Sequence, residues 1–227
     1  MPDLPVSKTC FCFPALGGMS ERTRDLLEAA RAAGYPVVRN AESPHDRARG
    51  MLAAQGLATG ADWLVWVDAD QVATLDQALA LVATGEREAA DLMSGLYVCR
   101  HHAARNQLAL NVTFAFSGPV KFGAGGEVYP IVGCGFGFVA TRASLFQRIE
   151  APACEYGRAW FLPLIAGGKH LGEDRSFCVR AKLSGAVMRA DTRVLVGHIG
   201  THEYTVDELV AIDNLKAMQQ QRNPPPR

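Results

Sequence analysis

The feature of this chain that most constrains its fold is an apolar run over residues 61–70 that ends in two aspartates, Asp68 and Asp70. A short and nearly continuous apolar run is typical of a strand that is buried on both faces of a parallel sheet. The aspartates then stand at the carboxyl end of that strand, which is the edge where open α/β sheets bind ligands. The run therefore predicts an α/β fold with a polar site just beyond residue 67.

Two interpretations of Asp68 and Asp70 are open from the sequence. In the first, the aspartates mark an ordinary exit from a strand and cap the helix that follows, because Asp favours N-caps and turns. In the second, the carboxylates hold a divalent cation against the diphosphate of a nucleotide, since hard cations prefer oxygen ligands. The second interpretation makes nucleotide-sugar chemistry the first functional hypothesis.

Length and charge limit the classes of partner. The 227 residues can bury a full core, and we expect one domain over 1–227, with an ordered core over about 9–218 and a flexible tail over 219–227. Basic and acidic residues balance at 23 each, so no overall field favours nucleic acid or an anionic membrane. The start of the chain lacks a signal-peptide pattern and no apolar run is of membrane-spanning length, so we expect a cytoplasmic protein. The six cysteines lack Cys-x-x-Cys spacing and are expected to be buried and free.

In the first hundred residues, strand and helix candidates alternate, which predicts a parallel sheet covered by crossover helices. We expect strands at 9–13, 35–39, 63–67 and 91–98, and helices at 22–33, 43–59 and 75–83. Ser43 and Thr74 are expected to cap helix starts, with Pro44 in the first turn, and Gly34 and Gly60 to end helices.

The second half of the chain has a different pattern. Strand candidates at 108–116 and 129–141 are separated by the glycine-rich turn 123–126, which predicts antiparallel or mixed pairing. Helices are expected at 142–149, 173–184 and 205–219, with short strands at 187–190 and 193–196. The predicted fold class is therefore α/β, with a mixed and mostly parallel sheet flanked by helices.

Three further segments carry candidate site residues. Alternate glycines over 133–139 predict a strand with one bare face, suited to a flat ligand or another backbone, or else a bulge or tight helix packing. Glu173 and Asp174 begin a predicted helix, where an acid can also serve only to offset the helix dipole. His198 follows an apolar strand, where it is either a core residue or a ligand for manganese alongside carboxylates.

Together, Arg47-Ala48-Arg49, Val67-Asp68-Ala69-Asp70, Gly133-Cys134-Gly135-Phe136, Gly172-Glu173-Asp174 and Gly197-His198 resemble, in this order, the GT-A class of glycosyltransferases. More narrowly, the chain looks like the small bacterial and phage-associated members that have a single catalytic domain. The resemblance covers most of the chain, from about residue 9 to residue 202, and implies a GT-A, Rossmann-like fold.

The resemblance also implies a metal site and a donor. Asp68 would face the ribose or a metal-bound water, Asp70 would ligate the metal, and His198 would complete the site. The expected cofactor is a divalent cation, with Mn2+ favoured and Mg2+ as the other choice. The expected donor is a nucleotide-diphosphate sugar, with UDP favoured. Pro14, Arg47 and Arg49 are candidates for contacts with the nucleotide.

The resemblance implies a general base as well. In inverting members a Glu-Asp pair at a helix start supplies it, which indicates Asp174, with Glu173 as the substitute. We expect an inverting hexosyltransferase. The chain departs from the family at residues 15–18, which are Ala-Leu-Gly-Gly rather than polar. Recognition of the uracil base of the nucleotide is therefore open. Residues 150–170 match no known acceptor region, so the acceptor, a glycan, lipid, protein or small molecule, is open too.

Two other functions compete with this hypothesis. A metal-dependent phosphoesterase or nucleotidyltransferase would use Asp68, Asp70, His198 and His202 as its cation site, although the chain lacks a P-loop motif. A non-catalytic module would bind a nucleotide or glycan without turnover. Trp160 and Phe161 either stack on a sugar acceptor or belong to the core. The oligomeric state is open.

Overall fold

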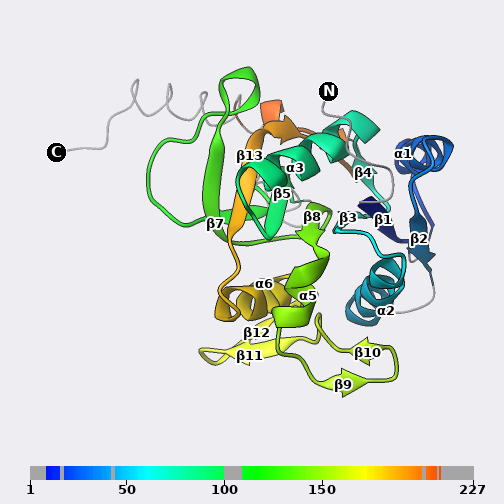
Figure 1. Ribbon diagram of the computed structural model, residues 1–227. Coiled ribbons are helices and arrows are strands. Elements are labelled where there is room, and N and C mark those ends of the chain that lie inside the picture. Colours follow the sequence, from blue (N-terminus) through cyan, green and yellow to red (C-terminus); the bar gives the residue numbers. More distant parts are fainter. Residues whose placement is uncertain are drawn as a thin grey trace.

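The computed structural model of the protein describes residues 9–15, 18–41, 44–99, 109–200, 203–208 and 210. Its centre is an eight-stranded sheet with the strand order β2-β1-β3-β8-β5-β13-β7-β6 (Figure 1). The strands are β1 (Thr9–Pro14), β2 (Val37–Asn40), β3 (Trp63–Val67), β5 (Leu92–Leu96), β6 (Val112–Phe114), β7 (Val128–Cys134), β8 (Phe138–Arg142) and β13 (Met188–Leu195).

Most strands of this sheet run in one direction. β1 pairs in parallel with β2 and β3, and β13 pairs in parallel with β5. β8 lies antiparallel between β3 and β5, so those two strands also share a direction. The predicted α/β class with a mixed, mostly parallel sheet is confirmed. One consequence is that the carboxyl ends of β1, β3 and β5 lie at the same edge of the sheet.

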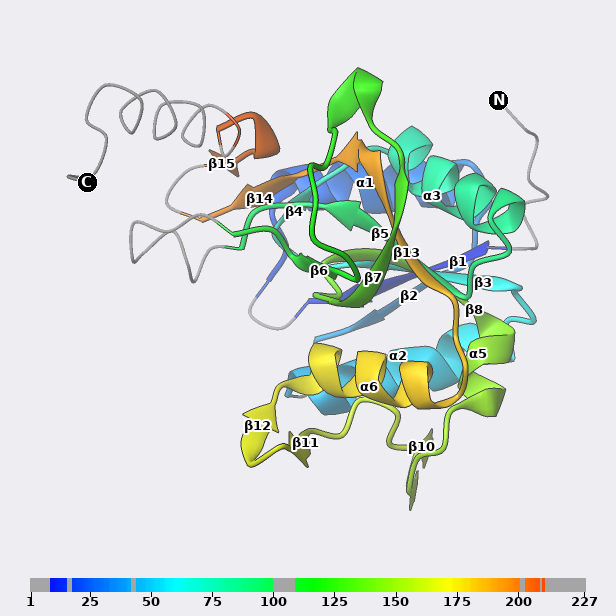
Figure 2. The same cartoon turned by 90° about the vertical axis from the view of Figure 1, so that its left-hand side faces the viewer.

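Helices cover both faces of the sheet (Figure 2). α1 (Glu21–Ala32) and α3 (Leu75–Arg87) lie on one face, and α2 (His45–Ala58), α5 (Ala143–Arg148) and α6 (Glu173–Leu183) lie on the other. Trp63, Val65 and Val67 of β3 belong to the core under α1 and α3, while Leu64 and Trp66 belong to the second core. Burial on both faces explains why β3 is an uninterrupted apolar run.

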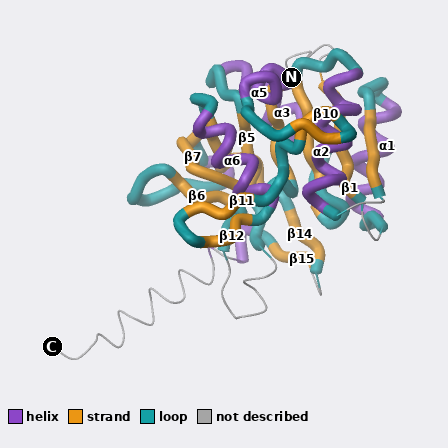
Figure 3. Tube along the Cα trace, turned by 90° about the horizontal axis from the view of Figure 1, so that it is seen from below, coloured by secondary structure: helices purple, strands orange, loops and turns teal. Residues whose placement is uncertain are grey.

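Smaller elements frame the edges of the sheet. β4 (Gln71–Val72), β14 (Gly197–Ile199) and β15 (Glu203–Tyr204) form a ribbon in the order β15-β14-β4. The hairpin of β9 (Ala153–Cys154) and β10 (Gly157–Arg158) precedes that of β11 (Leu164–Ala166) and β12 (Lys169–Leu171), which lies beside α6 (Figure 3). A 3-10 turn, η2, spans Gly123–Gly125. Within the described residues, each helix is too short or too polar to cross a bilayer.

The prediction of one strand over 129–141 is wrong. β7 and β8 are separate strands that occupy different places in the sheet, and Gly135, Phe136 and Gly137 connect them. In the opposite sense, the two strands predicted at 187–190 and 193–196 are the single strand β13, with an irregular register between Ala190 and Leu195. An alternating pattern cannot reveal where a strand is divided or where two strands are continuous, because it indicates which face a residue occupies and not which strand lies beside it.

The helix boundaries lie within a few residues of the predicted ones, but of the N-caps only Thr74 is the residue predicted. Ser20 caps α1, and Thr74 caps α3, which extends beyond the predicted residue 83 to Arg87. Pro44 is the N-cap residue of α2 rather than part of its first turn, and Ser43 lies outside the described residues. Residues 206–208 and 210 are helical, whereas the rest of the helix predicted at 205–219 and the tail at 219–227 lie outside the described residues.

Candidate functional site

A cleft of about 410 Å³ opens at the edge of the sheet where β1, β3 and β5 end. Each of these strands contributes the residue or residues at its end: Pro14, then Asp68 and Asp70, then Tyr97. The cleft is lined by Pro14, His45, Arg49, Asp68, Ala69, Asp70, Tyr97, Cys99, Gly135, Glu173, Asp174 and His198. The topology thus brings together every catalytic, metal and nucleotide candidate that the resemblance implies except Arg47.

Arg49 is the centre of the charged group in this cleft. It follows His45 by one turn of α2, so both side chains face the cleft from the same side of the helix. Although the Arg49 side chain is only 2% exposed, its Nη1 lies 3.0 Å from Asp68 Oδ1 and its Nε lies 3.2 Å from Asp174 Oδ1. Glu173 Oε1 lies 4.0 Å from the same Nε. One buried cation therefore serves three carboxylates.

This imbalance of charge acts on the pKa values of the group. Burial raises the pKa of Asp174 to about 6, and the charges of Glu173 and Asp68 add to this effect while Arg49 opposes it. Burial also disfavours the charged form of Arg49, but Asp174 and Asp68 outweigh it and raise the Arg49 pKa. Asp174 is therefore a carboxylate that changes its charge close to neutral pH, as a general base requires.

The position of Asp174 is fixed from two sides. It lies in the first turn of α6, after the N-cap residue Gly172, and its Oδ2 accepts a hydrogen bond of 3.0 Å from the backbone N–H of Phe136. The Arg49 guanidinium carbon lies 5.7 Å from the centre of the Phe136 ring, which forms the floor beneath the cation. Phe136 packs edge to face on Trp66 and Phe177 in the core.

The charged group is held mainly by electrostatic attraction. Arg49 Nε, Asp68 Oδ1 and Asp174 Oδ1 are buried and lie within ion-pair distance, but their geometry gives no well-aligned hydrogen bond. Within the described residues, the Arg49 guanidinium donates an aligned hydrogen bond from Nη2 to Asp68 Oδ2 at 3.2 Å. Buried polar atoms without aligned partners are rare in folded proteins and often belong to functional sites.

Gly135 and Gly137, on either side of Phe136, make room for the Tyr97 side chain, and Gly137 also makes room for Gln71. A Cβ atom on Gly135 would lie 2.5 Å from Tyr97 Oη, and one on Gly137 would lie 2.8 Å from it. The Gly137 backbone N–H instead donates a hydrogen bond of 3.0 Å to Tyr97 Oη. Because glycine is the residue without a Cβ, the two glycines permit this close contact.

Asp70 and His198 face each other where β14 pairs with β4, next to the residues that follow β5. His198 Nδ1 lies 2.7 Å from the carbonyl oxygen of Val98, and since a carbonyl can only accept, Nδ1 carries the proton. His198 Nε2 lies 3.3 Å from Asp70 Oδ1. In the neutral imidazole, the lone pair of Nε2 then faces a carboxylate oxygen. This arrangement is repulsive unless a second proton or a cation lies between the two atoms.

The spacing of these two atoms suits a shared metal ion. Neighbouring ligands of an octahedral ion with bonds of about 2.1 Å are about 3 Å apart. The 3.3 Å between His198 Nε2 and Asp70 Oδ1 is close to this value. The bond from His198 Nδ1 to Val98 is the kind of outer contact that orients a histidine ligand. In the described part of the chain, no three His, Cys, Asp or Glu side chains are already grouped to hold a metal ion.

Some predicted residues lie elsewhere. Arg47 points away from the residues that line the cleft, and its guanidinium pairs at 3.2 Å with Glu155, in the turn between β9 and β10. Trp160 and Phe161 are 6% and 0% exposed, so they belong to the core rather than to an acceptor platform. His202 lies outside the described residues.

Sequence reasoning missed three residues that line the cleft. His45, Tyr97 and Cys99 stand there beside the predicted set. Tyr97 and Cys99 follow β5, the next parallel strand beyond β3, and this position was the signal that could have identified them. The six cysteines are free, as expected, but Cys99 and Cys154 are only partly buried.

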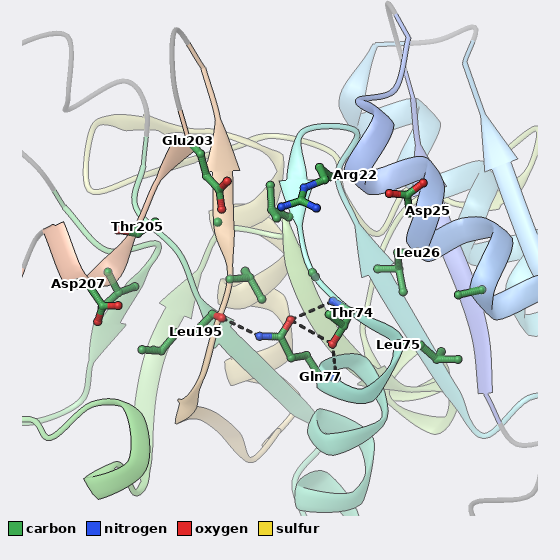
Figure 4. Close-up of a pocket in the computed structure, with 16 residues that line it drawn as sticks. Arg22, Asp25, Leu26, Thr74, Leu75, Gln77, Leu195, Glu203, Thr205 and Asp207 are labelled. Atoms are coloured by element: carbon green, nitrogen blue, oxygen red, sulfur yellow. Dashed lines mark hydrogen bonds between the residues drawn. The ribbon is translucent and has the colours of Figure 1, made fainter.

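A second and larger hollow, of about 510 Å³, lies between α1, the start of α3 and the β14–β15 ribbon (Figure 4). Its central polar groups already have partners: Thr74 and Gln77 form a capping box, and Gln77 Nε2 donates to the carbonyl oxygen of Leu195 at 2.8 Å. Arg22 and Asp25 line it from α1, Glu203 lines it from β15, and Asp207 follows that strand. Within the described residues, no ion pair joins these four side chains.

Comparisons with known proteins agree with this geometry at the level of the fold. No protein-family model and no curated protein sequence matches the chain. Among solved structures, A197 from STIV has a TM-score of 0.59 at 19% identity, over 85% of this chain and 86% of that one. GalNAc-T7, crystallised with UDP, GalNAc and Mn2+, has a TM-score of 0.53 at 11% identity, over 85% of this chain and 44% of that one, so this chain spans less than half of GalNAc-T7. The fold of this chain is that of the GT-A glycosyltransferases.

Proposed function

We propose that the protein is a metal-dependent glycosyltransferase that moves a sugar from a nucleoside-diphosphate donor, with UDP favoured, to a hydroxyl acceptor with inversion. The proposal is supported by two features of one cleft: His198 Nε2 lies 3.3 Å from Asp70 Oδ1, a spacing that would suit a shared cation, and the pKa of Asp174 is raised to about 6. The fold supports it, because GalNAc-T7, which shares that fold, was crystallised with UDP and Mn2+. Neither group alone would distinguish a transferase from a binding module.

The cation seat consists of Asp70 and His198. A carboxylate oxygen and a neutral imidazole are ligands that suit manganese, and diphosphate oxygens with water would complete the coordination. When bound, the ion would act as a Lewis acid that stabilises the charge on the departing diphosphate. Asp68 lines the same cleft, and its carboxylate pairs with Arg49. As the resemblance implies, Asp68 would contact the ribose or a metal-bound water when the donor binds.

Asp174 is the proposed base. As the acceptor oxygen forms its bond to the anomeric carbon, the bond from that carbon to the diphosphate oxygen breaks and its electron pair leaves with the diphosphate. The acceptor hydroxyl proton passes to the Asp174 carboxylate. Glu173, whose carboxylate lies 4.0 Å from Arg49 Nε, is the substitute.

Arg49 is a positioning residue in this proposal rather than a phosphate ligand. Its side chain is 2% exposed and its N–H groups are directed at the three carboxylates. It keeps Asp174 ionised against the effect of burial and holds Asp68 at the opposite side of the same cation. Arg47, which pairs with Glu155 at 3.2 Å on the exposed side of α2, has no part in the proposed mechanism.

Thermal stabilisation by nucleotides tests the proposal. We expect UDP or GDP to raise the Tm only when manganese is present, because a ligand that binds the folded state alone stabilises it by about 2.7 kcal/mol at a hundredfold excess over Kd. Asp70→Asn removes one ligand charge and almost no volume, and should abolish the manganese-dependent part. Asp25→Asn, in the second hollow, is the matched control and should behave as the wild type. Full stabilisation of Asp70→Asn at limiting manganese would overturn the metal assignment.

A further inference from the structure

A smaller hollow of about 240 Å³, called the side lobe here, adjoins the cleft. Four residues line both the cleft and the side lobe: Cys99, Gly135, Glu173 and Asp174. Asp174 therefore lies at the boundary between the two. Asp70 and His198 line only the cleft. A molecule in the side lobe can therefore meet Asp174 while another occupies the cation seat.

The inner wall of the side lobe has few polar groups to offer. The Asn111 amide is 3% exposed, and its Oδ1 accepts from the backbone N–H of Tyr97. Its Nδ2 donates to Ser94 Oγ and to the carbonyl oxygen of Gly95, both at 3.1 Å. Cys134 is fully buried. Recognition by charge in this lobe consequently depends on the first turn of α6, where Glu173, Asp174 and Arg175 lie.

Arg175 is the cation among the residues that line the side lobe. Its side chain is exposed and, among the described residues, it makes no hydrogen bond or ion pair, whereas Glu173 and Asp174 both lie beside Arg49. A Cβ atom on Gly133 would lie 3.4 Å from Arg175 Nη1, so the guanidinium extends across this bare position. Burial raises the pKa of Cys99 and the Arg175 charge opposes that rise, which indicates that the charge acts inside the lobe.

We propose that the side lobe binds the acceptor, and that Arg175 selects acceptors that carry an anionic group, a phosphate or a carboxylate, close to the hydroxyl that is glycosylated. The inference rests on the proposed transferase function. A guanidinium binds either anion through two parallel hydrogen bonds, whereas it adds little to the binding of a neutral polyol. The hydroxyl of such an acceptor would face Asp174 while its anion faces Arg175.

Matched probes with and without the anion test the proposal. The protein is first saturated with UDP and Mn2+, so that phosphate cannot enter the donor cleft, and its binding of glycerol 3-phosphate, glycerol, glucuronate and glucose is measured by calorimetry. We expect at least one anion to bind more tightly than its neutral partner, the phosphate pair and the carboxylate pair being separate arms. Arg175→Gln should weaken that binding about tenfold, the effect of losing one charge-assisted contact. Arg24→Gln, an exposed arginine of α1, is the matched control.

The outcomes separate this inference from the function on which it rests. Equal binding of charged and neutral probes, or binding of none, by protein that binds UDP would overturn the role of Arg175 and leave the transferase standing. An Arg175→Gln variant that loses UDP affinity to the same degree would place Arg175 at the donor and overturn the inference as well. Failure of UDP to bind at all would count against the proposed function, and Arg175-dependent binding of glycerol 3-phosphate would then support an anion site in the lobe by itself.

Discussion

The two large hollows of this molecule differ in what their polar groups are free to do. In the larger one, between α1 and α3, Thr74, Gln77 and the Leu195 carbonyl satisfy one another. In the smaller cleft, Asp68, Glu173 and Asp174 share the single buried cation Arg49, and the pKa of Asp174 is raised to about 6. The larger volume therefore does not make the first hollow the better candidate site, whereas converging charges and a shifted pKa favour the cleft.

The most damaging change to the cleft is expected to be Asp174→Asn. The variant keeps the size of the side chain but cannot accept the acceptor proton, and general bases contribute about 10²–10⁴-fold to rate. We expect kcat to fall by that factor, while manganese-dependent binding of UDP persists. The measurement is the rate of sugar transfer to an acceptor, monitored by the release of nucleoside diphosphate.

Glu173→Gln is the matched control for this change, because it removes the neighbouring charge from the same turn of α6. It should cost far less activity than Asp174→Asn. The reverse order would make Glu173 the base. Transfer that survives both substitutions would indicate either retention of configuration or a base outside this cluster. The charge cluster would then no longer support the smaller cleft as the catalytic site.

The part of the site that lies on strand ends could be predicted from the sequence. The run through Trp63 and Val67 indicates a strand buried on both faces, and β3 has those bounds. Since parallel strands end at one edge, the position of Asp68 and Asp70 beside Pro14 follows from topology alone. Asp174 and His198 reach the same cleft, and their chemical roles stay predictions.

The part that depends on side-chain contacts between distant segments could not be predicted. Arg47 and Arg49 look equivalent in the sequence, yet α2 turns one to Glu155 and the other into the buried charge cluster. The glycines at 135 and 137 indicate a close approach, but only the fold shows that Tyr97 makes it. Contacts of this kind depend on packing between segments far apart in the chain, which local patterns do not record.

A smaller effect is expected from Arg49→Met, which removes the cation and keeps a long side chain. Asp174 must be ionised to act as a base, so wild-type kcat/KM should fall as the pH drops through about 6. Without Arg49, the charges of Asp68 and Glu173 act unopposed and the pKa of Asp174 rises further. The acidic limb of the pH profile should therefore move to higher pH. A profile that keeps its position while activity falls would mean that Arg49 has a structural role only.

The raised pKa of Asp174 also affects stability. The folded state binds the Asp174 carboxyl proton more tightly than the unfolded chain does. Stability is therefore lost as the pH rises from 3.8, the ordinary pKa of an aspartate, to about 6, the pKa of Asp174 in the fold. Asp174→Asn removes the titrating group, so the difference in Tm between variant and wild type should change across this window. A difference that is constant from pH 4 to pH 7 would contradict the displaced pKa.

The smallest expected effect belongs to the larger hollow, and it tests the comparison from the other side. Thr74→Ala removes the N-cap of α3. In the wild type the Thr74 hydroxyl accepts a hydrogen bond of 3.2 Å from the backbone N–H of Gln77. Loss of such a cap costs about 1 kcal/mol, or about 2–4 °C in Tm for a chain of this size. We expect that loss in a thermal melt, with unchanged UDP affinity and unchanged transfer, because the polar groups there support the helix and not a ligand. Should Thr74→Ala instead weaken nucleotide binding at full stability, the larger hollow would be a binding site too, and satisfied polar groups would no longer distinguish a structural hollow from a functional one.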